Sequence, residues 1–549
     1  MDDYLWWRDG IIYQIYPRSF ADSNGDGLGD LPGITARLDY LAELGIDAIW
    51  LSPFYPTPDA DFGYDVSDHT AVDPRFGTLE DFDRLVTEAH RRGIRVVLDL
   101  VLNHTSDRHS WFLESRASRD NPKRDWYIWR PPSCSPPIFF ENGGRRRGAG
   151  VPNNWRAAFG GSAWEYDETT GQYYFHMFLA EQPDINWRNP QARQAQLDVV
   201  RFWLERGADG FRLDVFNAYF KDAQFRNNPP RLGLRGFDRQ RHLYDCDQPE
   251  MIPLLNELRA ILDAYPERYS VGETFFATPE KVLHYCGSDR LHAAFSFDFT
   301  SSNLFYPWNP AWLFKQIERR EAIFTGERWP TTVLSNHDIP RTATRYVRGE
   351  EDALAKIAMA LLLTLRGTPF MYYGEEIGMR DIHLRRSEIM DPPGKRYWPI
   401  YKGRDGCRSP MQWDDTPFAG FSSAKPWLPV HPNYHRRNVA TQREDPDSLL
   451  NFTRKLIALR KEYPALRRGD FVPLTTRPHD ALVYLRRIDG QTVLVALNFS
   501  NQTVRAPLAQ EVTGQRWRSL LTAKDDGGTF LSDTCLELTP HQVCLLVAP

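Results

Sequence analysis

The feature that most constrains the fold is a recurring pair of segments, in which a short apolar stretch is followed by a longer stretch with helical spacing. Residues 95–102 are almost continuously apolar and run directly into Asn103 and His104. Such a stretch is typical of a parallel strand that is covered on both faces. Helix-like stretches at 82–92 and 190–206 alternate with strands of this kind. This alternation predicts a parallel α/β architecture.

The same pattern supplies enough strands for a closed barrel. The expected strands are residues 11–16, 46–51, 95–102, 211–215, 269–273, 293–299, 331–338 and 368–373, and a helix is expected at 31–44. Several of these strands end in an acidic residue. Because the active sites of (β/α)8 TIM barrels lie at the carboxyl ends of the strands, we predict that fold.

Two segments depart from this rhythm and predict additional domains. Residues 105–173 are rich in Trp, Pro, Gly and Arg and are too long for a simple loop, so we expect a small inserted domain after the third strand. After residue 465 the pattern changes to short strands between turns, which predicts a C-terminal antiparallel β-sandwich. The expected domains are a catalytic barrel at 1–104 and 174–465, the insertion at 105–173 and the C-terminal domain at 466–549.

Composition excludes several classes of function. The 549 residues carry a net charge of -5, which gives no electrostatic basis for binding nucleic acid or an anionic membrane. The six cysteines are scattered without a CxxC pair, so neither a disulfide framework nor a zinc site is expected. Residues 357–365, the longest apolar run, fall short of the ~20 that span a bilayer. Without an apolar leader segment, we expect a cytoplasmic protein that needs no organic cofactor.

Arg212 and Asp214 are the first candidates for catalysis. Side chains alternate along a strand, so these two should point the same way at the end of the fourth strand. A guanidinium lowers the pKa of a neighbouring carboxylate, and an ionised carboxylate in a sheltered cleft is what a covalent nucleophile requires. The competing interpretation is a purely structural ion pair.

A second cluster of oxygen-bearing residues follows the first strand. Its members are Asp22, Asn24, Asp26, Leu28 through its carbonyl, and Asp30. The spacing matches the first nine positions of a calcium loop, although Gly33 stands where the bidentate Glu is expected. We expect a structural divalent cation, Ca²⁺ with Mg²⁺ as the alternative, because many hard oxygens converge. The competing interpretation is an acid-rich turn without metal.

Five motifs occur in an order that resembles glycoside hydrolase family 13, the α-amylase superfamily, and within it the α-glucosidase and oligo-1,6-glucosidase group. They are residues 99–104, 182–186, 210–214, 272–273 and 335–338. The resemblance extends from Trp6 to the C-terminus, and the loop at 22–30 matches the metal loop of this group. Any one motif would be weak evidence, whereas the ordered set is specific.

The resemblance implies the roles of three acids. Asp214 corresponds to the nucleophile, Glu273 to the general acid/base and Asp338 to the stabiliser of the transition state. A retaining glycosidase needs one ionised carboxylate and one protonated carboxylic acid, so the pKa of Glu273 should be raised while Asp214 stays charged beside Arg212. A third carboxylate stabilises the cationic oxocarbenium ion.

The resemblance also implies the residues that hold the sugar, which are Tyr64, Asp65, His104, Phe178, Gln182, Arg212, His337 and Arg408. Asp65 and Arg408 correspond to the pair that binds the terminal glucose hydroxyls. Such a pair closes one end of the pocket and leaves room for a single sugar unit. The resemblance therefore implies exo-action, with one glucose removed from the non-reducing end.

The expected function is an exo-acting retaining α-glucosidase that hydrolyses terminal α-linked glucose from di- and oligosaccharides through a covalent β-glucosyl-enzyme. The alternative is a glucosyl-transferring or isomerising relative of the sucrose isomerase or trehalose synthase type, which would use the same carboxylates. A non-catalytic, transporter-associated relative is disfavoured by the intact acids and the absence of an apolar span. Val215 resembles the residue found in α-1,6-acting members, which favours isomaltose-type substrates.

Overall fold

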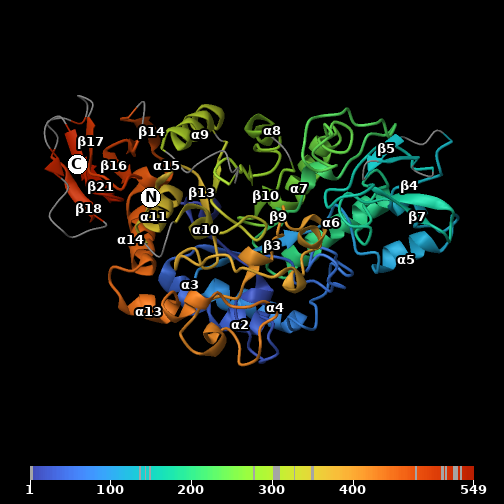
Figure 1. The fold of residues 1–549 in the computed structure, drawn as a ribbon, viewed down its shortest axis with the longest axis horizontal. Coiled ribbons are helices and arrows are strands. Elements are labelled where there is room, and N and C mark those ends of the chain that lie inside the picture. The colour runs from blue at the N-terminus through green and yellow to red at the C-terminus, as the bar shows by residue number, and fades with distance from the viewer. Residues whose placement is uncertain are drawn as a thin grey trace.

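The computed structural model describes residues 4–548, apart from residues 135–137, 142–143, 148–149, 276–277, 301–309, 327, 348–351, 476–478, 508–511, 513–515, 523–529 and 532–534. Figure 1 shows a central parallel barrel with a small lobe on one side and a C-terminal β domain on the other. In the described part of the chain, no helix combines the length and hydropathy needed to cross a bilayer.

Eight parallel strands form the barrel, which confirms the predicted fold. They are β1 (Ile12–Ile15), β2 (Ala48–Leu51), β3 (Arg95–Leu100), β9 (Gly210–Leu213), β10 (Tyr269–Gly272), β11 (Ala293–Ala294), β12 (Thr331–Val333) and β13 (Thr368–Tyr372), in the order β11-β10-β9-β3-β2-β1-β13-β12. The terminal strands β11 and β12 are joined by a side chain, because the Thr331 hydroxyl accepts from the Ser296 amide at 3.3 Å and donates to the Ala294 carbonyl at 3.4 Å.

Three elements differ from the expectation. The strands expected at 293–299 and 331–338 are confined to β11 and β12, so the acids that follow them lie on loops. The helix expected at 31–44 is divided into α2 (Leu31–Ala36) and α3 (Leu38–Leu44), because Arg37 leaves helical geometry and places its guanidinium over the Trp413 ring at 4.2 Å. No helix-breaking residue marks that position in the sequence.

Helices surround the barrel. They include α4 (Leu79–Arg91), α6 (Pro190–Glu205), α7 (Met251–Asp263), α8 (Pro279–His284), α9 (Pro310–Ile323), α10 (Thr342–Tyr346), α11 (Ala353–Thr364), α12 (Pro392–Tyr397), α13 (Val439–Glu444), α14 (Leu449–Glu462) and α15 (Pro464–Arg468), whereas α5 (Ser110–Ala117) lies in the inserted lobe. α4 begins with a capping box between Thr78 and Asp81, which satisfies amide groups that have no partner within the helix. α11 is apolar on all sides because it is buried between α14 and the C-terminal strands.

The inserted lobe covers the carboxyl end of the barrel. It contains β4 (Trp129–Arg130), β7 (Trp164–Asp167) and β8 (Gln172–Phe175) in one sheet, with β5 (Ile138–Glu141) paired to β6 (Gly144–Arg147). β8 crosses the predicted boundary at 173/174. The buried hydrophobic cluster of the lobe includes Trp155 and Phe175 and continues into Phe178 and Val215 beside the end of β9. The lobe therefore shares its core with the mouth of the barrel.

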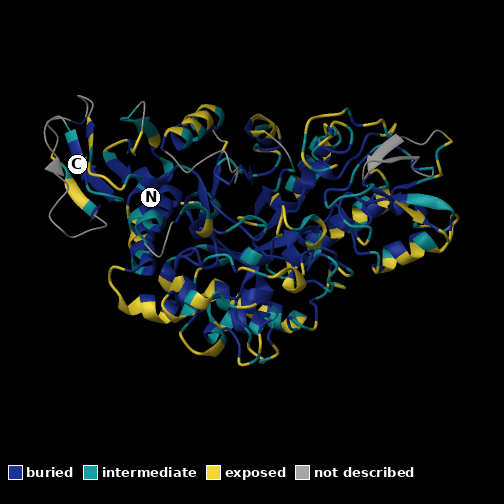
Figure 2. Ribbon diagram, in the orientation of Figure 1, coloured by how far each residue is buried: buried dark blue, intermediate teal, exposed yellow. Residues whose placement is uncertain are grey.

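The C-terminal domain consists of two antiparallel sheets. One contains β14 (Asp470–Pro473), β15 (Ala481–Ile488), β16 (Gln491–Asn498), β21 (Val543–Ala548) and β18 (Arg518–Thr522), and the other contains β17 (Val504–Pro507), β20 (Cys535–Leu538) and β19 (Phe530–Leu531). The Tyr484 and Thr364 hydroxyls are 2.6 Å apart and link β15 to α11. Figure 2 shows buried residues running from the barrel into this domain.

Candidate active site

Arg212 is the centre of the site, because its guanidinium contacts three carboxylates. Nη1 lies 2.6 Å from both Asp99 Oδ1 and Asp214 Oδ1, and Nη2 lies 2.6 Å from Glu273 Oε2. The barrel register explains this arrangement, since Arg212 on β9 is level with Asp99 on β3. Arg212 is 1% exposed, so these ion pairs lie in a low-dielectric interior.

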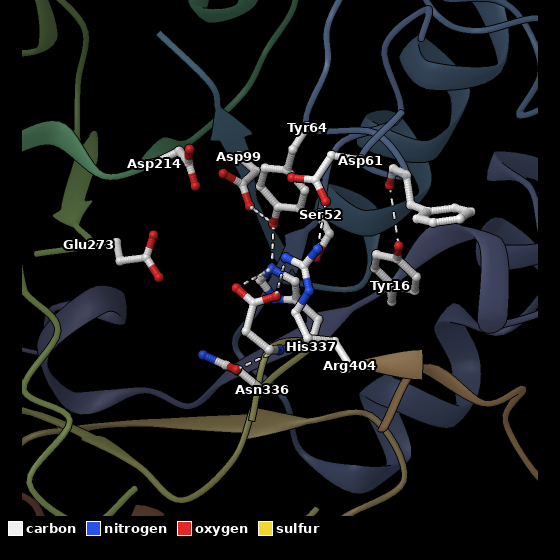
Figure 3. Close-up of polar contacts among 12 residues, drawn as sticks. Tyr16, Ser52, Asp61, Tyr64, Asp99, Asp214, Glu273, Asn336, His337 and Arg404 are labelled. Atoms are coloured by element: carbon white, nitrogen blue, oxygen red, sulfur yellow. Dashed lines mark hydrogen bonds and ion pairs between the residues drawn. The ribbon is translucent and has the colours of Figure 1, made fainter. Parts of the chain in front are cut away.

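Asp214 and Glu273 directly follow neighbouring strands β9 and β10. The Glu273 amide donates to the Leu213 carbonyl at 2.9 Å, and the Val215 amide lies 3.4 Å from Glu273 Oε2. Figure 3 shows both carboxyl groups on one side of an open space, with Tyr64, Asp61 and Arg404 on the other side. The two acids are thus held on opposite ends of one guanidinium.

Burial decides the protonation of these acids. It raises the pKa of both Asp214 and Glu273 to about 7, although Arg212 acts in the opposite direction on each. The raised pKa of Glu273 agrees with the predicted acid/base role. Arg212 lowers the pKa of Asp214, as predicted, but burial outweighs this effect, because one cation is shared by three buried acids.

Asp338 has the opposite electrostatic environment. Burial acts to raise its pKa, but His337 and the guanidinium groups of Arg404 and Arg408 outweigh burial and hold the pKa well below the usual range. Asp338 Oδ1 lies 2.8 Å from Arg408 Nη2 and 3.3 Å from Arg404 Nη1. This carboxylate is therefore negative near neutral pH.

Tyr64 and the two predicted histidines form a neutral hydrogen-bonded layer. The Tyr64 hydroxyl donates to Asp99 Oδ2 at 3.0 Å and lies 2.6 Å from His337 Nε2, as Figure 3 shows. Burial lowers the pKa of His104 to about 4 and that of His337 to about 3, so neither ring is charged near neutrality. Gln182 Nε2 lies 3.1 Å from His104 Nε2. The Tyr64 ring stacks on His337 at 5.3 Å.

A cavity of about 180 Å³ opens between these groups. The predicted residues that line it are Tyr64, His104, Phe178, Gln182, Asp214, Glu273 and Asp338, and further lining residues are Asp61, Phe159, Val215, Phe275, Tyr401 and Arg404. The structure thus brings all three predicted catalytic acids to one cavity. Arg212, His337 and Arg408 lie directly behind lining residues, at 2.6, 3.3 and 2.8 Å from Asp214 or Asp338.

Asp65 does not reach the cavity. Its carboxylate accepts from the Thr57 hydroxyl at 2.7 Å and from the Ala60 and Asp61 amides at 2.8 and 2.9 Å, so it holds its own loop together. The acid and arginine pair that lines the cavity is instead Asp61 and Arg404, whose Oδ1 and Nη2 atoms are 2.6 Å apart. In the sequence, Asp61 precedes Asp65 by four residues, and Arg404 precedes Arg408 by four residues. Nothing in the sequence pattern indicates that the earlier residue of each pair lines the cavity.

In the loop at 22–30, backbone amides occupy many of the candidate ligand oxygens. Asp22 accepts from the amides of Asn24, Gly25 and Gly27, and Asp30 accepts from the Ser23 and Gly33 amides and caps α2. Among the described residues, no group of three or more His, Cys, Asp or Glu side chains is arranged to hold a metal ion. The cation therefore remains a prediction.

Two family models match the chain. Residues 14–469 match the α-amylase catalytic domain, and residues 472–544 match the C-terminal domain of maltogenic amylase. A probable α-glucosidase of Rhizobium meliloti is 45% identical over 92% of this chain and 91% of its own length. An oligo-1,6-glucosidase of Parageobacillus thermoglucosidasius is 40% identical over 91% of each chain.

Solved structures with the same fold include enzymes of other specificity. The α-glucosyl transfer enzyme XgtA superposes with a TM-score of 0.91 at 43% identity over the whole of both chains. The trehalulose synthase MutB of Pseudomonas mesoacidophila superposes with a TM-score of 0.89 at 35% identity over 99% of each chain.

Proposed function

Because the chain belongs to glycoside hydrolase family 13, the α-amylase family, we propose that it is an exo-acting retaining α-glucosidase. The observation that carries this proposal is the sharing of Arg212 by Asp214 and Glu273 at one edge of a cavity that Asp338 also lines. Glycoside hydrolysis with retention requires such a pair of closely spaced carboxyl groups, of which one is ionised and one protonated.

The residues suggest a two-step reaction. Protonated Glu273 gives its proton to the leaving oxygen while ionised Asp214 attacks C1, which forms a β-glucosyl-enzyme. Glu273 then removes a proton from the attacking water, and the bond between Asp214 and C1 breaks with overall retention of the α-configuration. Asp338, held negative by its two arginines, stabilises the positive charge that develops on the ring in both steps.

A polar pair in the cavity wall supports exo-action. Asp61 and Arg404 both line the cavity and present an acceptor and donors to the terminal hydroxyl groups of a sugar. Phe159, Phe178 and Phe275 form the apolar wall, with ring centroids 5.5 Å apart for the first two and 5.6 Å for the last two. Apolar rings flanked by a few polar groups are typical of small-molecule sites.

Glucosyl transfer or isomerisation is the second candidate, supported by the similarity to XgtA and MutB. The two activities share the glucosyl-enzyme and differ in what attacks it. The experiment is product analysis by NMR with maltose, isomaltose and sucrose as substrates. Hydrolysis predicts free α-glucose as the first product, whereas a dominant isomer or longer oligosaccharide would favour the second candidate, and initial release of β-glucose would refute retention.

Linkage preference is proposed to be α-1,6. Val215 lines the cavity directly after the proposed nucleophile. A single side chain in such a position changes selectivity by ~1–3 kcal/mol, or about 10- to 200-fold. The ratio of kcat/KM for isomaltose and maltose, measured for the natural protein and for Val215→Thr, tests this preference. An unchanged ratio would mean that another residue determines the linkage preference.

The loop at 22–30 is proposed to bind Ca²⁺ through oxygens of Asp22, Asn24, Asp26, Asp30 and the Leu28 carbonyl, with Mg²⁺ as the weaker alternative. The hard oxygen donors of the loop support this proposal. Calcium should raise the melting temperature of EDTA-treated protein, and Asp26→Asn should reduce the increase. Equal melting curves with and without the ion would contradict the proposal.

A further inference from the structure

Residues 392–403 form a loop whose two ends meet at a narrow neck formed by Asp391, Arg404 and Asp405. This loop contains α12 and Tyr401, which lines the active-site cavity. The loop also contacts the inserted lobe closely, because a Cβ atom added to Gly160 would lie 2.3 Å from the Tyr397 hydroxyl and 2.6 Å from Arg396 Nε. The loop thus forms the part of the cavity wall that meets the lobe.

Two buried carboxylates hold the neck from opposite sides. Asp405 Oδ2 accepts from the Met390 and Asp391 amides at 2.7 and 3.0 Å, and Asp391 Oδ2 accepts from the Arg404 amide at 3.1 Å and the Gly394 amide at 3.3 Å. Both carboxylates are 0% exposed. The carboxylate of each acid therefore binds backbone amides of the opposite segment of the neck.

Asp391 has a second role that Asp405 lacks. Its Oδ1 accepts from Arg404 Nε at 2.8 Å and from Arg404 Nη2 at 2.6 Å, which fixes the guanidinium from the side away from the cavity. The same Nη2 atom also lies 2.6 Å from Asp61 Oδ1, and Nη1 lies 3.3 Å from Asp338 Oδ1. Asp391 itself is not among the residues that line the cavity.

We propose that Asp391 is a positioning residue that fixes Arg404 between Asp61 and Asp338 and thereby sets recognition of the terminal sugar. This inference rests on the proposed function. Asp61 and Asp338 face the cavity, so a sugar competes with Arg404 for their oxygens during binding. The bond to Asp391 is out of reach of the sugar, and it keeps the guanidinium in place while the other two contacts rearrange.

Asp391→Asn tests the inference, because an amide presents one acceptor and one donor where the natural carboxylate meets hydrogen-bond donors at both oxygens. Either the Arg404 side chain or the neck amides then face an NH₂ group. Loss of a charged hydrogen bond predicts a fall of about 10- to 100-fold in kcat/KM for isomaltose, expressed mainly as a higher KM, and an equal rise in the inhibition constant of glucose.

Asp405→Asn is the matched control, since its Oδ1 atom has no hydrogen-bond partner among the described residues and can be replaced by the amide nitrogen while Oδ2 keeps both contacts. We expect its kcat/KM to stay within about threefold of the natural value. Melting temperatures of both variants separate loss of folding from loss of recognition. If Asp391→Asn does not fold, Asp391→Ser, which leaves space for water at the neck, takes its place in the same measurements.

A double-mutant cycle with Arg404→Met decides the matter. If Asp391 acts through Arg404, the double variant is no less active than Arg404→Met alone. An equal fold-loss from Asp391→Asn in both backgrounds, or natural kcat/KM in Asp391→Asn, would overturn the inference. Failure of the proposed function is distinguishable, because the natural protein would then release no glucose from any tested substrate.

Discussion

Arg212→Met is the perturbation that most directly tests the electrostatics of the site. The substitution removes the cation that lies 2.6 Å from an oxygen of Asp99, Asp214 and Glu273, and it keeps an apolar side chain of similar length. The three acids would then be buried together without this compensating charge. Each should resist ionisation more strongly than in the natural protein.

The magnitude follows from the geometry. A unit charge about 4 Å away contributes roughly 4 kcal/mol at an effective dielectric constant near 20, which corresponds to about 3 pKa units. Burial already raises the pKa of Asp214 to about 7 in the natural protein. A further rise of about 3 pKa units lowers the ionised fraction of the nucleophile, and kcat/KM at pH 7 should therefore fall several hundredfold.

The pH profile separates this effect from simple damage. The pKa of Glu273 rises together with that of Asp214, so the window in which one acid is ionised and the other protonated moves to higher pH by about 2–3 units. The assay is kcat/KM from glucose release across that range. Arg320→Met is the control, because that buried guanidinium donates to the Thr332 hydroxyl and the Arg366 carbonyl, away from the catalytic acids. A uniform loss of activity with an unchanged optimum would refute the reasoning.

Three further predictions follow from the same structure. Glu273→Gln should lower kcat for isomaltose by about 10²- to 10⁴-fold and abolish the alkaline limb of the pH profile. The loss should be far smaller for aryl glucosides with good leaving groups, which need no proton from the enzyme. Equal losses on both substrates would argue against the acid role of Glu273. Asp61→Asn should raise KM by about 10-fold or more while leaving the acidic limb in place, and a shifted acidic limb would indicate a different function for Asp61. Burial raises the pKa of Glu376, which accepts from the Tyr13 and Tyr40 hydroxyls at 2.7 and 2.6 Å. Glu376 therefore keeps its proton to higher pH in the folded state than in the unfolded state, and the free energy of unfolding falls as pH rises from the unfolded pKa toward the folded one. Glu376→Gln should thus raise the melting temperature at pH 8 but not at pH 4. A lower melting temperature at pH 8 would contradict this prediction.

The sequence was sufficient to predict the barrel and its catalytic edge. Apolar stretches such as 95–102 have few alternatives to a buried parallel strand, and an acid at the end of such a strand must lie at the carboxyl edge. The convergence of Asp214, Glu273 and Asp338 follows from that topology. The sequence did not reveal Asp99 as the third partner of Arg212, because that contact depends on the register between β3 and β9.

Other errors have equally local causes. The choice of Asp65 over Asp61 and of Arg408 over Arg404 depends on loop conformation, which residue type alone does not specify. The protonation of Asp214 depends on how many acids share one guanidinium and how deeply they are buried, neither of which a linear sequence contains. Arg37 stands where the helix divides, and its side chain contacts Trp413, a residue far along the chain.

The junction between β11 and β12 has a mechanical consequence. Every other neighbouring pair of barrel strands is joined by a backbone ladder, whereas this pair is joined through the Thr331 hydroxyl. Glu273 follows β10 on one side of the junction and Asp338 follows β12 on the other. Opening the barrel at this junction breaks the two long hydrogen bonds of the Thr331 hydroxyl and no backbone ladder. We therefore expect the distance between Glu273 and Asp338 to change more readily than any other distance in the catalytic centre.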